Sequence, residues 1–115
     1  MKEAIEKLIE NIVEDFRRYE EKSPYGDEAR KAERVEEFAK GLEAKEGNKY
    51  IKIVSKNFPS ECVWGFVVNT DNDKKFKRGD ILKAAGWAAP ARNKPRGNVL
   101  DGNFESVLWT GPAYL

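Results

Sequence analysis

The sequence contains no histidine and only one cysteine, Cys62. Histidine is the commonest general base and the commonest metal ligand, so its absence excludes a His-based catalytic triad. A single cysteine excludes an intrachain disulfide and a cysteine-rich zinc site. We therefore expect Cys62 to be a small buried apolar side chain, and we expect the protein to hold no metal and no cofactor.

Long apolar runs are also missing, since no segment approaches the length that spans a membrane. The N-terminus passes from Met1 directly into a charged amphipathic segment, which is not the pattern of a signal peptide. The 115 residues are too few for a cofactor-binding domain plus a substrate domain. These features predict a single domain over residues 1–115, located in the cytoplasm and without a membrane partner.

The near-neutral total of 21 basic and 20 acidic side chains conceals two unlike halves. Residues 1–47 carry 10 basic and 14 acidic side chains, a net charge of −4, whereas residues 48–115 carry 11 and 6, a net charge of +5. A separation of this kind indicates that the two halves have different tasks. The basic half is the candidate for binding an anionic partner.

Two amphipathic helices are predicted in the first half. Over residues 2–21 the apolar side chains recur at helical spacing, namely Ile5, Leu8, Ile9, Ile12, Val13, Phe16 and Tyr19. Residues 23–26 break this pattern, and Asp27 is a suitable N-cap for the next helix. The second pattern ends at residues 46–48 and contains Ala29, Ala32, Val35, Phe38, Ala39 and Leu42. The short connection predicts an antiparallel helical hairpin over residues 1–47.

From Lys49 the apolar spacing changes to two, which is typical of β-strands. Strands are predicted at residues 50–55, 63–68 and 104–110. Asn57-Phe58-Pro59-Ser60 has hairpin-loop composition, and residues 81–84 form either a further strand or a short helix capped by Asp80. These elements predict an α+β fold, in which the N-terminal antiparallel helical hairpin precedes a small, mostly antiparallel β-sheet or roll over residues 48–115.

Residues 86–103 are rich in glycine, proline and asparagine, which is loop chemistry over an unusually long span. Trp87, Val99 and Leu100 are apolar anchors, so we expect this loop to be pinned to the domain. Pro90 and Pro95 stiffen it further. A long loop that is held in place commonly carries function.

Catalytic constellations do not emerge from the residue spacing. Asp71-Asn72-Asp73 has the opening of a calcium loop, but Phe76 stands where that loop requires glycine and Leu82 where it requires a bidentate glutamate. No two carboxylates of residues 48–115 have a spacing that predicts a paired-carboxylate hydrolase. The glycine fingerprints of phosphate-cradling loops are missing as well. We therefore predict a binding protein and not an enzyme.

The strongest binding signal lies in residues 74–96, which have eight basic residues and one acidic residue, a local net charge of +7. Such a segment attracts anions. Arg92 and Arg96 carry forked guanidinium groups that can hold a phosphate bidentately, and Lys94 adds charge between them. Asn93 is placed to read a base edge or a ribose. This segment predicts a site for a nucleotide or another anionic ligand.

Aromatic rings near this stretch add a second signal, because a nucleobase stacked on an aromatic face gains about 1–3 kcal/mol. Trp87 in the loop and Phe66 on a predicted strand are the candidates. A place in the core is the competing interpretation for Phe66, and for Trp87 both interpretations are open. Arg17 and Arg18 near the end of the first helix either favour the helix dipole or line a second anion site at an oligomer axis.

These features together resemble the Thoeris anti-defence sponge family of bacteriophages, whose members sequester signalling nucleotides. The resemblance consists of the small size, a helical pair before a compact β domain, the segment Arg92-Asn93-Lys94-Pro95-Arg96 and an upstream Phe66 on a strand. It extends over most of the chain. It implies a non-enzymatic homo-oligomer, from dimer to hexamer, that captures cyclic ADP-ribose isomers and in some members cyclic di- or trinucleotides in the host cell cytoplasm.

The resemblance also implies roles for individual residues. Arg92 and Arg96 would hold the pyrophosphate of the ligand. Phe66 or Trp87 would stack on its adenine. For a cyclic oligonucleotide, the contact would come from one of the two arginines that end the first helix, Arg17 or Arg18.

Two other functions are open. A nucleic-acid-binding or nuclease-inhibiting small phage protein, similar in role to anti-CRISPR proteins, would use the same basic residues along a strand. A protein-interaction protein would present the acidic helices of residues 1–47 to a basic host factor. A sponge returns its ligand unchanged, whereas nucleic-acid binding weakens steeply with salt, so these functions can be distinguished.

Overall fold

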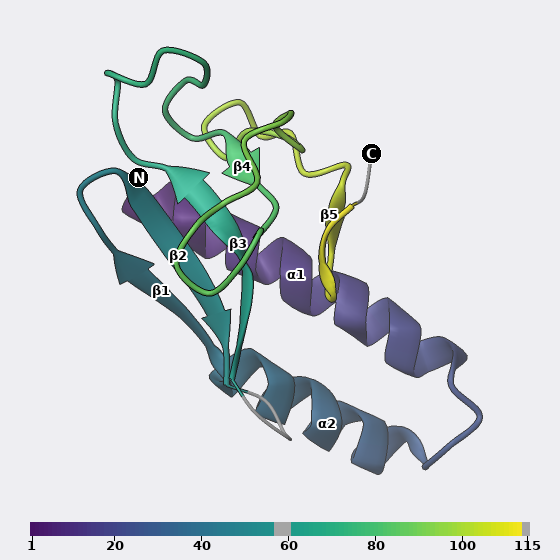
Figure 1. The fold of residues 1–115 in the computed structure, drawn as a ribbon. Coiled ribbons are helices and arrows are strands. Elements are labelled where there is room, and N and C mark those ends of the chain that lie inside the picture. The colour runs from purple at the N-terminus through teal and green to yellow at the C-terminus, as the bar shows by residue number, and fades with distance from the viewer. Residues whose placement is uncertain (57–60, 114–115) are drawn as a thin grey trace.

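The computed structural model describes residues 1–56 and 61–113, which form two helices, a four-stranded sheet and a two-stranded sheet (Figure 1). The helices are α1 (Lys2–Lys22) and α2 (Glu28–Lys40). The strands are β1 (Leu42–Glu46), β2 (Tyr50–Ser55), β3 (Cys62–Val68), β4 (Ile81–Leu82), β5 (Val107–Leu108) and β6 (Gly111–Pro112). The predicted α+β fold, with its N-terminal helical hairpin and antiparallel sheet, is confirmed.

α1 packs its apolar stripe against one face of the four-stranded sheet, as the spacing predicts. Leu8 and Ile12 in the middle of the stripe are fully buried, and they share one core with Ile53 of β2. The helix ends at Lys22, and the backbone of the C-cap residue Ser23 is extended (φ −72°, ψ 137°). A residue that precedes proline disfavours helical angles, so Pro24 sets this end.

α2 begins at the predicted N-cap and returns beside α1 (Figure 1). The Asp27 carboxylate accepts a hydrogen bond from the backbone N–H of Arg30 at 2.9 Å, which satisfies one of the open donors of the first turn. Arg34 of α2 donates to the carboxylate of Glu20 on α1 at 2.6 Å. Glu20 is buried, so this ion pair is shielded from water and fixes the helices to each other.

The second helix is shorter than its apolar spacing predicts, and the prediction that residues 42–46 are helical is wrong. The helix ends at Lys40, and these residues form β1 instead. β1 pairs with β2 in an antiparallel ladder that places Leu42 opposite Ser55. Pairing with β2 stabilises residues 42–46 as a strand more than their helical spacing stabilises a helix, because sheet stability comes from cross-strand contacts. The helical part therefore ends at Lys40 and not at residue 47.

The sheet has the order β1-β2-β3-β4, and every neighbouring pair is antiparallel. The register between β2 and β3 shifts between Ile53 and Val54, which leaves Trp64 without a partner in the ladder. Residues three apart on a regular strand lie on opposite faces. The bulge turns Trp64 toward the same core as Val67, beneath α1.

The opposite face of the sheet carries a second, smaller cluster of buried residues: Phe66, Val68, Phe76 and Leu82. The loop that follows β4 crosses this face, on the side away from α1 (Figure 1). Cys62 at the first position of β3 is exposed, so the prediction of a buried cysteine is wrong. Its place at the end of the strand leaves it outside both clusters.

The last described residues form a hairpin of two short strands where a single strand over residues 104–110 was expected. β5 pairs with β6 in an antiparallel ladder. The indole N–H of Trp64 donates to the carbonyl oxygen of Leu108 at 2.7 Å, and the backbone N–H of Trp109 donates to the Asp15 carboxylate at 2.8 Å. These bonds attach the hairpin to β3 and α1 without a long ladder.

Two further local predictions can be compared with the structure. β4 is a strand, so the alternative of a short helix capped by Asp80 is wrong, and the Asp80 carboxylate instead accepts the backbone N–H of Lys77 at 3.1 Å. The loop predicted at Asn57-Phe58-Pro59-Ser60 lies outside the described residues. In the part of the chain that is described, no helix has the length and apolar character needed to cross a membrane.

The core beneath α1 provides a stability test. Replacing the fully buried Leu8 with alanine (L8A) should lower the free energy of unfolding by about 2–5 kcal/mol, because the change leaves a cavity between helix and sheet. Replacing Leu100, which is 51% exposed, with alanine should cost about 1 kcal/mol or less. Urea denaturation followed by circular dichroism measures both values. Equal losses in the two variants would contradict the packing described here.

Candidate functional site

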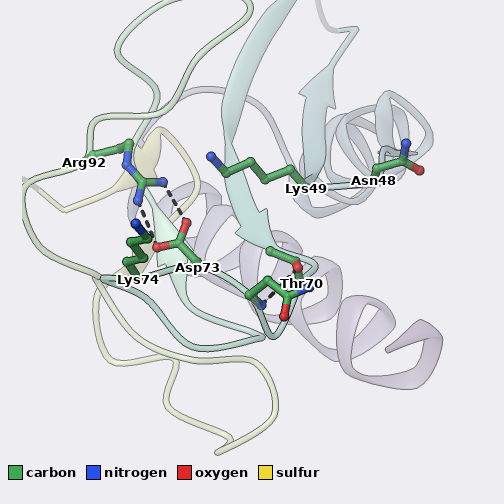
Figure 2. Close-up of a pocket in the computed structure, with 7 residues that line it drawn as sticks. Asn48, Lys49, Thr70, Asp73, Lys74 and Arg92 are labelled. Atoms are coloured by element: carbon green, nitrogen blue, oxygen red, sulfur yellow. Dashed lines mark hydrogen bonds and ion pairs between the residues drawn. The ribbon is translucent and has the colours of Figure 1, made fainter.

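A pocket of about 520 Å³, lined by charged and polar residues, lies where the β1–β2 turn, the turn after β3 and the loop after β4 come together (Figure 2). We call it the basic pocket. Its lining residues are Asn48, Lys49, Thr70, Asn72, Asp73, Lys74 and Arg92. In Figure 2 the side chain of Lys49 extends toward Arg92, which is bound to Asp73. Three cations and one carboxylate thus line the same pocket.

The turn after β3 is folded by its own short polar side chains. The backbone N–H of Asn72 donates to the hydroxyl oxygen of Thr70 at 3.1 Å. The Asp73 carboxylate accepts the backbone N–H groups of Lys75 and Phe76 at 2.8 and 3.0 Å. Bonds of this type favour turns over regular structure. Phe76 is buried, so it anchors the turn and leaves the polar side chains at the pocket.

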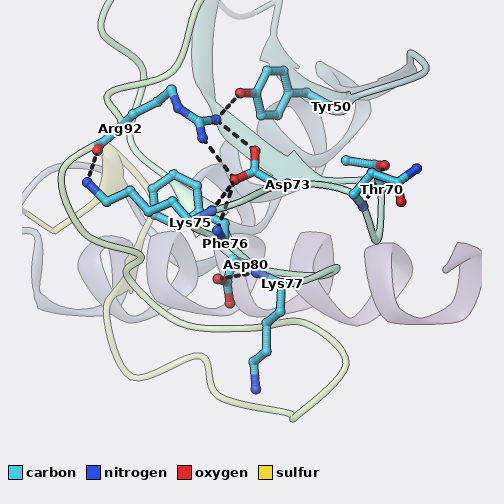
Figure 3. A network of polar contacts seen from close by, with 9 residues as sticks. Tyr50, Thr70, Asp73, Lys75, Phe76, Lys77, Asp80 and Arg92 are labelled. Carbon is cyan, nitrogen blue, oxygen red and sulfur yellow. Dashed lines mark hydrogen bonds and ion pairs between the residues drawn. The ribbon is translucent and has the colours of Figure 1, made fainter.

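Arg92 reaches this turn from the loop after β4 and forms the central ion pair of the pocket (Figure 3). Its two terminal nitrogens donate to the two carboxylate oxygens of Asp73, each at 2.9 Å. One of them also donates to the hydroxyl oxygen of Tyr50, and the guanidinium carbon lies 4.9 Å from the ring centre of Phe76. Lys75 donates to the carbonyl oxygen of Arg92. The guanidinium is therefore held in one orientation.

The ion pair changes the pKa of both partners. The hydrogen bonds from Arg92, followed by those from the backbone of Lys75 and Phe76, hold the pKa of Asp73 far below its usual range. The hydrogen bond to Asp73 raises the pKa of Arg92 above its ordinary value. Both groups are therefore charged at neutral pH. The side chain of Asp73 is 1% exposed and that of Arg92 is 38% exposed, so the pair presents its cation to the pocket.

Lys49 and Lys74 supply the positive charge that no carboxylate balances. Neither lysine forms an ion pair with a carboxylate of the described residues. The Lys49 ammonium lies 5.5 Å from the ring centre of Tyr50. Because Asp73 balances Arg92, the pocket keeps the charge of its two lysines.

The predicted clamp of Arg92 and Arg96 must be corrected, because the two side chains have different surroundings. Arg96 is 7% exposed, and its guanidinium donates to the carbonyl oxygens of Ala113 and Lys94 at 3.2 and 2.8 Å. It also donates to the side-chain oxygen of Asn93 at 2.8 Å. Arg96 is therefore a buried structural residue that attaches the loop to the C-terminal hairpin, and only Arg92 lines the basic pocket.

Asn93 and Lys94 lie at the surface between these two arginines. The side-chain oxygen of Asn93 accepts from Arg96 and from the backbone N–H of Lys94 at 2.9 Å, so this atom is used within the loop. The side-chain oxygen of Asn93 is therefore not available to accept a hydrogen bond from a base, as the prediction required. Lys94 is exposed and forms no ion pair with a described carboxylate, so its contact with an anionic ligand stays a prediction.

The two candidate stacking rings differ in burial. Phe66 is 2% exposed and belongs to the second core cluster, where the ring of Tyr50 meets it edge-on at 5.8 Å between centres. The prediction of Phe66 as a stacking ring is therefore corrected, because the loop after β4 covers this face of the sheet. Phe66 is a core residue.

Trp87 is 50% exposed at the tip of a tight loop. The backbone N–H groups of Ala85 and Gly86 both donate to the carbonyl oxygen of Ala89, at 3.0 and 3.2 Å, which closes the loop. The Lys52 ammonium of β2 lies 4.5 Å from the centre of the indole ring. Of the predicted apolar anchors only Val99 is buried, since Trp87 and Leu100 are half-exposed. The loop is attached beside β4 by the backbone instead, where the N–H of Ala91 donates to the carbonyl oxygen of Lys83 at 2.7 Å, and stacking on Trp87 stays a prediction.

Arg17 and Arg18 lie on the surface of α1 and pair with the acids three residues earlier, Glu14 and Asp15. Arg17 also lines a pocket of about 390 Å³ between the two helices. The charged residues of that pocket are Arg17, Glu20, Glu21, Glu28 and Lys31. Acidic side chains outnumber basic ones in this pocket, so a single copy of the chain is not expected to bind an anion there. A site shared between copies stays a prediction.

Sequence reasoning missed most of the basic pocket, because its residues come from three separate turns. Lys49 lies in the β1–β2 turn, outside the basic segment of residues 74–96, and Lys74 is only one of the eight basic residues of that segment. A usable signal was present in Thr70 and Asp73, whose short side chains commonly bond to the backbone two or three residues ahead. Such residues mark an ordered turn, and Asp73 was considered only as part of a calcium loop.

The chemistry available to the pocket is that of hydrogen-bond donation to an anion. Lysine and arginine donate to phosphate or carboxylate oxygens through charge-assisted bonds, which are about twice as strong as neutral ones. Within residues 1–56 and 61–113, no group of three or more cysteine, aspartate or glutamate side chains is placed to hold a metal ion. Its three basic side chains make the pocket a candidate anion site.

Comparison with known proteins identifies the family of this chain, whose function is unknown. The whole chain, residues 1–115, matches a family of unknown function, DUF7717, and the protein belongs to that family. No curated protein and no solved structure matches the chain.

Replacing Asp73 with asparagine (D73N) tests the central ion pair. Because the pKa of Asp73 is lower in the folded than in the unfolded chain, its contribution to stability is present above the unfolded pKa of about 3.9. It is lost as the pH falls toward the folded value. We expect D73N to be less stable than the native protein at pH 7 and to lose less stability between about pH 5 and pH 2.

Urea denaturation at a series of pH values measures this difference. D71N is the matched control, since Asp71 lies two residues away and its side chain is 77% exposed in its ion pair with Arg78. An exposed pair of this kind contributes little. If D73N and D71N gave the same stability at every pH, the central role of the Asp73–Arg92 pair would be wrong.

Proposed function

We propose that this protein binds a phosphate-bearing nucleotide in the basic pocket and leaves it chemically unchanged. One observation carries the proposal: Lys49, Lys74 and Arg92 line a pocket whose single carboxylate, Asp73, is already bound to Arg92. The two lysines are thus available to an anion. A cationic pocket raises the local concentration of anionic ligands and donates charge-assisted hydrogen bonds to their oxygens.

Trp87 supports a nucleotide over inorganic phosphate. Tyr50 and Lys52 lie on the same face of β2, about 7 Å apart, because residues two apart on a strand share a face. Tyr50 contacts Arg92, and Lys52 lies over the ring of Trp87. The half-exposed indole is therefore near the basic pocket on one face of the sheet. A base stacked on such a ring gains about 1–3 kcal/mol.

Binding without conversion is supported by the proton chemistry of the pocket. The sequence has no histidine. The hydrogen bonds from Arg92 hold the pKa of Asp73 far below its usual range, so this carboxylate is a weak base at neutral pH. The remaining lining residues are lysines, amides and a hydroxyl. They provide recognition contacts for a ligand and no general base matched to neutral pH.

The resemblance to the Thoeris anti-defence sponge family supplies the biological role in this proposal. The protein would be a homo-oligomer in the host cell cytoplasm that sequesters a cyclic ADP-ribose isomer or a cyclic oligonucleotide and so antagonises anti-phage immunity. The residue roles change from those the resemblance implies. Arg92 is kept, and Lys49 and Lys74 replace Arg96. Of the two alternative stacking rings, Trp87 is kept and Phe66 is left out.

The double variant K49Q/K74Q tests the pocket. We expect its dissociation constant for the bound nucleotide to rise by about tenfold or more, because hydrogen bonds from charged groups contribute about 1.5–3 kcal/mol each. Isothermal titration calorimetry with cyclic ADP-ribose isomers and cyclic di- and trinucleotides measures the affinity. After heating, chromatography should recover the ligand intact.

The control is K7Q/K22Q, which removes the same charge from α1, away from the pocket. Equal losses of affinity in the two double variants would show that only the overall charge matters. No binding of any of these nucleotides by the native protein, or recovery of a hydrolysed product, would overturn the proposed function.

Nucleic-acid binding, including inhibition of a nuclease, is the second candidate function. The observation that favours it is a row of basic residues beside the exposed indole. Lys45 of β1 lies opposite Lys52 of β2, and the Lys52 ammonium lies over Trp87. Cations along a strand next to a stacking ring are typical of surfaces that bind single-stranded nucleic acid without sequence preference.

Replacing Trp87 with alanine (W87A) tests this second candidate. Fluorescence anisotropy with labelled single and double strands should show binding that falls steeply with salt, by about 0.7 log units per log unit of salt for each single-strand phosphate neutralised. W87A should lose about 1–3 kcal/mol of single-strand affinity. Y25A removes a ring that is 76% exposed outside this surface and is the control. A flat salt dependence excludes this function.

A further inference from the structure

β1 forms one edge of the four-stranded sheet, and no described strand lies on its outer side (Figure 1). The hydrogen bonds just beyond the two ends of β1 show which of its residues bond to β2. The backbone N–H of Gly47 donates to the carbonyl oxygen of Tyr50, and the backbone N–H of Lys56 donates to the carbonyl oxygen of Gly41. Bonding residues alternate along an antiparallel ladder, so the odd-numbered residues of β1 bond to β2. The residues whose N–H and C=O groups point to the free edge are Leu42, Ala44 and Glu46.

We propose that two copies of the chain associate through β1, in an antiparallel pairing centred on Ala44. In this register Ala44 lies opposite Ala44 of the second copy, and Leu42 lies opposite Glu46. Each outward residue then exchanges both of its backbone hydrogen bonds with the residue opposite it. Glu43 lies opposite Lys45 of the second copy, and the two-fold symmetry repeats this contact.

The charges of β1 select this register over its neighbours. Centring the pair on Glu43 or on Lys45 would place identical charges opposite each other, which is destabilising. In the proposed register the opposite charges meet at non-hydrogen-bonded positions, where Cα atoms are only about 4.5 Å apart. Charged side chains commonly protect an edge strand from pairing, but opposite charges directly across from each other stabilise a pair of strands. The alternating signs of β1 complement a second copy in this register.

Lys45 supplies independent support, because it faces a like charge across the β1–β2 ladder. It lies directly opposite Lys52 of β2 and forms no ion pair with a described carboxylate. Glu43 pairs with Lys56 at 2.6 Å in the same chain. A carboxylate has acceptor sites for more than one donor, so Glu43 can bind Lys56 and Lys45 of the second copy together.

An apolar groove beside β1 extends the interface on the α1 side of the sheet. It has a volume of about 390 Å³, and its apolar lining includes Ile5, Ile9, Ala44 and Ile51. In the proposed register Leu42 of the second copy lies opposite Glu46, which also lines the groove. Residues two apart on β1 share a face, so Leu42 is on the groove side. The second copy would therefore cover this groove, and the apolar surface buried there would stabilise the dimer in addition to the backbone hydrogen bonds.

Charge exchange between two variants tests the register. Sedimentation equilibrium is run on the native chain, on E43K, on K45E and on an equimolar mixture of the two variants. The native chain should dimerise between about 10 μM and 1 mM, as expected for a small interface. Each variant alone places like charges opposite each other twice, so its dimer should be at least about tenfold weaker.

The mixture is the decisive measurement. A pair made of one E43K and one K45E chain has opposite charges at both contacts, so the mixture should recover the native affinity as a heterodimer. A native chain that stays monomeric at about 1 mM overturns the proposal. Variants that dimerise as well as the native chain, or a mixture that stays monomeric, also overturn this register.

Ala44→Pro gives a second test that does not depend on charge. Proline removes the outward N–H of residue 44, and an edge strand tolerates proline where its N–H faces solvent. We expect at least about a tenfold weaker dimer with an unchanged near-ultraviolet circular dichroism spectrum. Nucleotide titration of the basic pocket uses Lys49 and Lys74, which are not in β1, so failure of the dimer and failure of the proposed function are separate results.

Discussion

The bidentate ion pair between Asp73 and Arg92 is the interaction on which the basic half of the molecule depends. Asp73 is held in the turn after β3, Arg92 comes from the loop after β4, and the hydroxyl of Tyr50 on β2 contacts the same guanidinium. One side chain thus joins three segments that are distant in sequence. The Asp73 side chain is 1% exposed with Arg92 in place, so loss of Arg92 would leave its carboxylate with only the backbone N–H groups of Lys75 and Phe76 as partners within the turn.

The same pair limits how the pocket can act. Arg92 is oriented before any ligand arrives, which reduces the entropy lost on binding. Its charge is already shared with Asp73, so a phosphate at this guanidinium competes with a carboxylate that cannot move away. The attraction for an anion therefore depends more on Lys49 and Lys74, and Arg92 provides geometry. The sequence shows that an arginine is present, but it does not show whether that arginine supplies free charge or only a fixed geometry.

The sequence predicts a structural element well when that element is determined by residues close to it in the chain, and poorly when it is determined by distant contacts. The first helix and the Asp27 cap follow from spacing and capping within a few residues, and both are present. The strand at residues 42–46 was missed because its partner, β2, lies beyond the next turn, while Leu42 continues a helical spacing. Burial of Phe66 and Arg96 depends on where the loop after β4 crosses the sheet, and the contacts that hold this path, such as Asp73–Arg92, join residues that are distant in sequence.

The two surfaces proposed for ligand and for a second copy share one hairpin. The β1–β2 turn carries Lys49, and it is tied to the turn after β3 because the Asn69 side chain donates to the carbonyl of Gly47 at 3.0 Å. Arg78 donates in turn to the side-chain oxygen of Asn69 at 3.1 Å. A second copy paired to β1 would restrict the motion of this hairpin and so lower the ordering cost of a ligand at Lys49. By linkage, the ligand would then strengthen the dimer by the same factor.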